Sequence, residues 1–84
     1  MRRQLAPLKK KVSRLELEID DIEARLAELE EELADTALYE LENKSELQKL
    51  LKLQGSLNSE KDEKEAQWCE LLEELELKEM EISQ

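Results

Sequence analysis

The sequence predicts an all-α fold, an antiparallel two-helix coiled-coil hairpin, from its composition, its apolar spacing and its charge distribution. Of the 84 residues, 43% are charged, while glycine and proline occur once each, which is typical of long helices. Only one Trp and one Tyr are present, so a compact globular core would have little to bury. We expect one domain over 1–84, with a first helix at about 6–34, a tip at 35–44 and a second helix at about 45–82.

The first helix is predicted from apolar residues that alternate at three- and four-residue steps over four heptads. Proline suits the first turn of a helix, and it pushes the residue before it toward an extended shape. We therefore expect the helix to begin at Pro7, with Leu5 packing from just outside it or from a frayed turn. The apolar positions are Leu5, Leu8, Val12, Leu15, Ile19, Ile22, Leu26, Leu29 and Leu33.

The heptads stop at "ADTALYELENKS", which offers cap and turn chemistry instead of another repeat. A tight connection between two helices needs only about 2 to 5 residues, so this segment holds more apolar material than a turn requires. One interpretation is a short helical cap in which Leu38 or Leu41 packs on Leu33 and Leu47. In the other, part of the surface, foremost Tyr39, stays accessible as a contact point.

The second helix is predicted to begin near Ser45, which has the capping-box spacing with Gln48 in "SELQ". Its seam is weaker, because Lys61 and Lys64 occupy heptad positions and Gly55 costs about 1 kcal/mol in a helix. The stretch is either an imperfectly packed helix middle whose lysines reach acidic neighbours, or a hinge or partner contact. The predicted hairpin core is Leu8, Val12, Leu15, Ile19, Ile22, Leu26, Leu29, Leu33, Leu47, Leu50, Leu57, Trp68, Leu71 and Leu75.

Charge favours folding back over a parallel dimer. Residues 1–14 carry +6 and residues 15–84 carry −16. A parallel in-register dimer would place the basic block on itself, whereas a hairpin lays it beside residues 60–81, which carry −7. We therefore expect a monomer with paired charges. The predicted partners are Leu33 with Leu47, Val12 with Trp68, and Leu5 with Leu75.

Residues with catalytic or cofactor-binding patterns are missing from the sequence. It holds no His, no GxSxG, no CxxC and no phosphate-binding GxxxxGK[ST] loop, so we expect neither an enzyme nor a cofactor or metal site in this fragment. The single Cys69 cannot form an internal disulfide and is interpreted as an incidental small residue. No apolar stretch approaches the roughly 20 residues of a membrane span, and no signal peptide is visible. We expect a cytoplasmic protein without a membrane partner.

Two stretches, "RRQLAPLKKKVSRLELEIDDIEARLAELEEELADTALYE" and "EAQWCELLEEL", resemble the C-terminal coiled-coil domain of bacterial ABC-F proteins of the Uup/YheS type, which have tandem ATP-binding cassettes. The specific parts are the basic opening with "PL", the tip L-x-D-x-x-L-Y and the lone Trp of the second helix. The resemblance covers nearly the whole chain. It implies the C-terminal fragment of a cytoplasmic ATPase, whose cassettes bind ATP and Mg outside this fragment, and it implies the ribosome or rRNA as partner.

The resemblance implies a non-catalytic arm that positions its parent on the ribosome or on nucleic acid in translation-related work. Alternatives are a structural oligomerisation module and an autonomous DNA-binding arm. DNA binding is disfavoured, because the net charge is −10 and phosphates require unneutralised Lys and Arg. The basic block either pairs within the hairpin or presents its outward members to RNA. The candidate interaction residues are Leu38, Tyr39, Arg2, Arg3, Lys9, Lys10, Lys11 and Arg14.

Overall fold

The protein forms two long helices joined by two short 3-10 helices. The computed structural model describes residues 2–83, and their side chains from Leu5 to Glu81. Over this range there is no strand. The elements are α1 (Arg2–Leu33), η1 (Thr36–Tyr39), η2 (Leu41–Asn43) and α2 (Lys44–Ser83).

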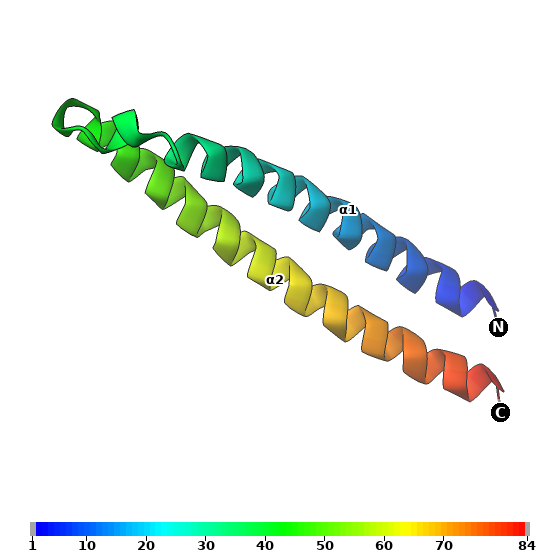
Figure 1. The fold of residues 1–84 in the computed structure, drawn as a ribbon. Coiled ribbons are helices and arrows are strands. Elements are labelled where there is room, and N and C mark those ends of the chain that lie inside the picture. The colour runs from blue at the N-terminus through cyan, green and yellow to red at the C-terminus, as the bar shows by residue number, and fades with distance from the viewer. Residues whose placement is uncertain (1, 84) are drawn as a thin grey trace.

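Helices α1 and α2 lie side by side and run in opposite directions (Figure 1). The blue start of α1 and the red end of α2 lie together at one end, which we call the base, and η1 and η2 lie at the other, the tip. The molecule measures 65 × 14 × 14 Å along its principal axes. With no third layer above or below the helix pair, none of the described side chains is fully buried. The core is therefore a single row of contacts.

The buried residues of α1 follow the alternating three- and four-residue spacing, as expected for one helix face that packs on a partner helix. Near the tip they join two leucines of α2 in one cluster of Ile22, Leu26, Leu29, Leu50 and Leu57, against which Leu33 and Leu38 pack. Burying one such side chain is worth about 1.5–3 kcal/mol. The buried hydrophobic residues are Leu5, Leu8, Val12, Leu15, Ile19, Ile22, Leu26, Leu29, Leu50 and Leu57.

Five residues of the predicted core are only half-buried. They are Leu33, Leu47, Trp68, Leu71 and Leu75, so most of the incompletely covered side chains belong to α2. None of the α2 side chains from position 58 to 81 is buried; each is half-buried or exposed. The half of α2 nearest the base is thus the least covered part of the seam.

The predicted start of the first helix is wrong, because α1 begins at Arg2 and contains Pro7. Leu5 is a buried seam residue within the helix, not a side chain that packs from outside it. A proline this close to the helix start lacks one N–H donor, and the carbonyl it leaves unpaired lies in the first turns, where water reaches it. The burial of Leu5 and Leu8 on either side of Pro7 offsets this loss.

The tip is held by hydrogen bonds from three polar side chains. The Asp35 carboxylate caps η1 by accepting a bond of 3.1 Å from the backbone N–H of Ala37. The Asn43 amide donates to the carbonyl oxygen of Ala37 at 2.8 Å. The hydroxyl of Tyr39 donates to the carbonyl oxygen of Leu33, also at 2.8 Å. A compact cap therefore replaces the roughly three turns that a continuous helix would have placed over residues 34–43.

Leu38 and Leu41 have different roles in this cap. Leu38 is half-buried and packs against the core cluster, as one of the two predicted alternatives required. Leu41 is 88% exposed, so the expectation that it could cover the seam is wrong. Leu41 begins the second 3-10 helix, and that placement turns its side chain away from the seam.

Candidate functional site

The basic block of α1 is exposed near the base of the hairpin. The side chains of Lys9, Lys10, Lys11 and Arg14 all lie at the surface. None of the four forms an ion pair with any residue that the structure describes, so the predicted pairing with residues 60–81 is not found for them. Arg2 and Arg3 lie outside the residues whose side chains are described.

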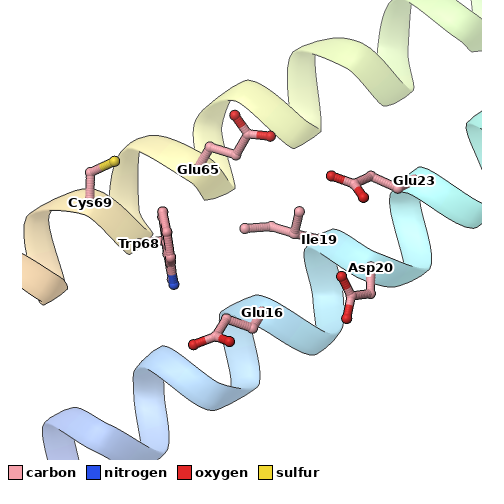
Figure 2. A pocket seen from close by; sticks show the side chains of 7 residues that line it. All are labelled: Glu16, Ile19, Asp20, Glu23, Glu65, Trp68 and Cys69. Carbon is pink, nitrogen blue, oxygen red and sulfur yellow. The ribbon is translucent and has the colours of Figure 1, made fainter.

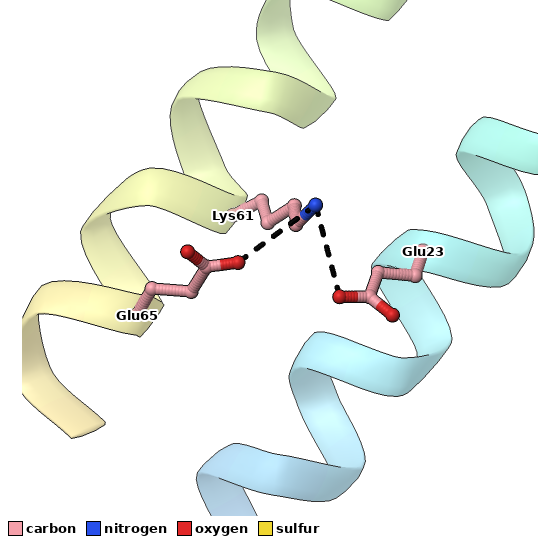
Figure 3. A network of polar contacts seen from close by, with 3 residues as sticks. All are labelled: Glu23, Lys61 and Glu65. Atoms are coloured by element: carbon pink, nitrogen blue, oxygen red, sulfur yellow. Dashed lines mark ion pairs between the residues drawn. The ribbon is translucent and has the colours of Figure 1, made fainter. Parts of the chain in front are cut away.

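The charge pairs between the helices are made instead by two lysines of α2. The Lys64 ammonium contacts the Glu18 carboxylate at 2.7 Å. Lys61 lies 3.7 Å from Glu23 across the seam and 3.8 Å from Glu65 on its own helix (Figure 3). The α1 acids that these lysines pair with, Glu18 and Glu23, follow the basic block in the sequence. Among the described side chains, Lys9, Lys10, Lys11 and Arg14 are left without an ion-pair partner.

Lys64 is the residue whose ionisation the fold changes. Its hydrogen bond to Glu18 raises the pKa of the ammonium above its ordinary value, an effect that partial burial opposes and that the charge of Glu18 and neighbouring carboxylates reinforces. The lysine is thus held in its charged form within the seam.

The unpaired cations line two shallow hollows on the outward side of α1. Lys10 and Arg14 lie one helical turn apart and belong to both hollows. The hollow nearer the base, of about 290 Å³, also includes Pro7 and Lys11. The other, of about 440 Å³, continues past Leu17, which is 71% exposed.

The two acids that line the larger of these hollows, Glu18 and Asp21, are already engaged elsewhere. Glu18 binds Lys64, and Asp21 forms an ion pair of 3.3 Å with Arg25. Lys10 and Arg14 therefore keep their donor groups for an external acceptor. Ammonium and guanidinium donors of this kind form charge-assisted hydrogen bonds with phosphate or carboxylate oxygens.

The predicted contact residues at the tip are only partly available. Leu38 is turned into the cap and contributes to packing. The ring of Tyr39 is 61% exposed, but its hydroxyl is used by the hydrogen bond to Leu33. What the tip offers to a partner is the face of one aromatic ring.

A family model described as the ABC transporter C-terminal domain matches residues 7–73. The chain belongs to this family. The matched part of the ABC transporter C-terminal domain contains the unpaired cations from Lys9 to Arg14, the whole tip and α2 as far as Glu73. No curated protein and no solved structure matches the chain.

Trp68 lines a hollow between the two helices, and its predicted pairing with Val12 stays a prediction. In this ABC transporter C-terminal domain Trp68 lies beside Glu16 and Ile19 in a hollow that does not include Val12 (Figure 2). Glu16 and Ile19 lie at least one helical turn closer to the tip than Val12 does. The half-buried Lys61 and Lys64 occupy α2 between Leu57 and Trp68, and their long side chains hold the helices by reaching across the seam.

No group of three or more His, Cys, Asp or Glu side chains that could hold a metal ion is found between residues 2 and 83. Within the same range neither helix has a stretch long and apolar enough to cross a bilayer. Cys69 is exposed as a free thiol.

Proposed function

We propose that this chain is the non-catalytic arm of an ABC-F ATPase of the Uup/YheS type, and that its coiled-coil hairpin positions the parent protein on the ribosome or on another RNA surface. Membership of the ABC transporter C-terminal domain family supports an accessory role beside ATP-binding cassettes. In this proposal ATP and Mg are bound by the cassettes of the parent, in the cytoplasm, and this fragment binds neither. The observation that carries the proposal is the unpaired basic face of α1.

The proposed mechanism is positional. Lys10 and Arg14 donate hydrogen bonds to phosphate oxygens, with Lys9 and Lys11 flanking them on the same helix. Because the rest of the chain is strongly acidic and the net charge is −10, other parts of the arm repel the phosphate backbone. Contact is therefore restricted to one short segment. Tethering this segment to the cassettes raises its local concentration at the RNA surface without any new contact.

The test is to reverse the charge of this face in the full-length ATPase. We expect Lys10→Glu with Arg14→Glu to weaken ribosome co-sedimentation and to lower the slope of log affinity against log salt by about 2, since two phosphate contacts are lost. The matched control is Lys49→Glu with Lys52→Glu, which changes the charge equally on exposed positions of α2 near the tip. An equal loss in both variants would mean that total charge, and not this face, governs binding.

Two other functions predict different results for the isolated chain. A structural oligomerisation module requires a stable dimer or larger species by sedimentation equilibrium. An autonomous DNA-binding arm requires retention of duplex DNA at physiological salt, which the net charge opposes. Either result would displace the ribosomal arm as the preferred function.

A further inference from the structure

A second surface, of opposite charge, lies between the helices in the half of the hairpin nearer the base. It is a hollow of about 400 Å³ formed by α1 on one side and α2 on the other (Figure 2). Trp68 and Ile19 lie toward each other across it, and carboxylates surround them. The lining residues are Glu16, Ile19, Asp20, Glu23, Glu65, Trp68 and Cys69.

The apolar part of this hollow is incompletely covered by the chain itself. Trp68 is only half-buried, although it is the largest side chain of the seam, so part of its ring surface is left at the hollow. Its indole N–H is buried and has no hydrogen-bond partner among the described residues. A buried indole N–H normally finds a partner. Packing within the hairpin therefore leaves part of the Trp68 ring uncovered, and this ring surface, not the buried N–H, is what an occupant can reach.

The charges of the hollow are also unbalanced. Of its four carboxylates, Glu23 and Glu65 share the single ammonium of Lys61. Glu16 and Asp20 form no ion pair with any of the side chains described, from Leu5 to Glu81. They lie one helical turn apart on α1, on the side of the hollow that faces Trp68. An aromatic face bordered by two unpaired acids is the arrangement that attracts a cation.

We propose that this hollow docks a basic segment of a partner protein by taking one arginine side chain. The guanidinium lies against the Trp68 ring, where its planar group stacks, and it donates hydrogen bonds to the carboxylates of Glu16 and Asp20. Arginine suits the site better than lysine, because the fork of donors reaches two carboxylates while the plane covers the ring. The two unpaired carboxylates favour a positively charged occupant over a neutral or acidic one.

Other occupants fit the hollow less well. The residues described include no group of ligands suited to a metal ion. A second copy of the chain would bring its own net charge of −10 against the same charge. RNA is excluded from this side by the carboxylates, so the proposal does not depend on the function proposed for the basic face. A Lys- and Arg-rich segment of a different protein complements both the negative charge of the hollow and the flat surface of the Trp68 ring.

Tryptophan emission, excited at a wavelength where tyrosine does not absorb, reports on this site alone, because Trp68 is the only tryptophan of the chain. We expect a short peptide of alternating arginine and glycine to change the emission of Trp68 in a saturable way, with one peptide bound per chain. The same peptide with citrulline in place of arginine keeps a planar group of similar shape, but it has no charge and carries a carbonyl oxygen in place of one NH2 donor group, so it should cause no change. No saturable change with the arginine peptide would overturn the proposal.

Two double variants separate the hollow from general attraction to an acidic chain. Glu16→Gln with Asp20→Asn removes the unpaired carboxylates, and Glu30→Gln with Glu31→Gln removes two exposed carboxylates near the tip. Measured by the anisotropy of a labelled arginine peptide, the first should weaken binding by about tenfold or more, and the second by less than about twofold. Equal losses would refute a defined site, as would a chain that is dimeric before peptide is added.

Discussion

The hydroxyl of Tyr39 donates a hydrogen bond of 2.8 Å to the carbonyl oxygen of Leu33, the last residue of α1. The last carbonyls of a helix have no intrahelical donor, and capping groups or water satisfy them. Tyr39 therefore closes α1 from the far side of the first 3-10 helix. The same residue exposes most of its ring, so it combines a structural hydroxyl with an accessible face.

Tyr39→Phe should lower the stability of the hairpin while it keeps the exposed ring. The lost hydrogen bond is worth about 0.5–1.5 kcal/mol. In a domain of this size, Tm falls by about 4–8 °C for each kcal/mol of stability lost. Thermal unfolding followed by circular dichroism measures it. An unchanged Tm would show that water replaces the hydroxyl without loss.

Leu38→Ala and Leu41→Ala should have unequal effects. Leu38 packs against the core cluster, so truncation removes buried apolar surface and should cost about 1–3 kcal/mol, less than for a fully buried leucine. Leu41 is 88% exposed, and its truncation should stay within about 0.5 kcal/mol of the parent. Urea unfolding at one temperature compares the two directly. Similar losses would mean that the tip packs differently.

The contact between Lys64 and Glu18 predicts a loss of stability in alkali. Because the hydrogen bond raises the pKa of Lys64 in the folded chain above its unfolded value, its contribution is fully present below the unfolded pKa and disappears as pH rises through the folded pKa. The free energy of unfolding should therefore fall above about pH 10. Lys64→Met serves as the control, since it differs from the parent protein at this position alone. The difference between the two curves should shrink as pH rises, and a difference that grows would contradict the assignment.

Gly55→Ala should stabilise the hairpin. Gly55 lies inside α2, and a Cβ added there would meet no heavy atom within 4 Å. Alanine is preferred over glycine within helices by about 0.5–1 kcal/mol, because glycine loses more backbone freedom on folding. Chemical denaturation should show a gain of this size at an unchanged m-value. A destabilised variant would point to a need for local distortion of α2 at this position.

Much of the seam on α1 follows from the heptad spacing alone. The residues predicted to face α2 from Leu8 to Leu29 are the ones that the structure buries, because the helix period places them on one face. The match is poorer on α2, where lysines interrupt the apolar pattern and burial at Trp68 depends on its position along α1. That position depends on the geometry of the two 3-10 helices, which spacing does not specify.

The candidate site was harder to predict, because it depends both on the side of each helix that a charge occupies and on how the two helices pack. Net charge favoured pairing of the basic block with the acids of α2, but pairing depends on which side of each helix the charges occupy. Lys61 and Lys64 lie in the seam and take Glu23 and Glu18, whereas Lys10 and Arg14 point outward. The hollow at Trp68 depends in turn on side chains from both helices, so neither segment predicts it separately.

The single row of contacts between α1 and α2 has a mechanical consequence. Each turn is held only by its neighbours, as in a repeat array, so the helices can separate turn by turn without loss of the rest. Because Arg2 and Ser83 lie at the same end, tension on the flanking chain would peel the hairpin open from its half-buried base toward the cluster of Ile22, Leu26 and Leu29. Amide hydrogen exchange should show the same order, with the slowest amides in that cluster. The hairpin would then yield gradually under load and reseal from the tip once the load is released.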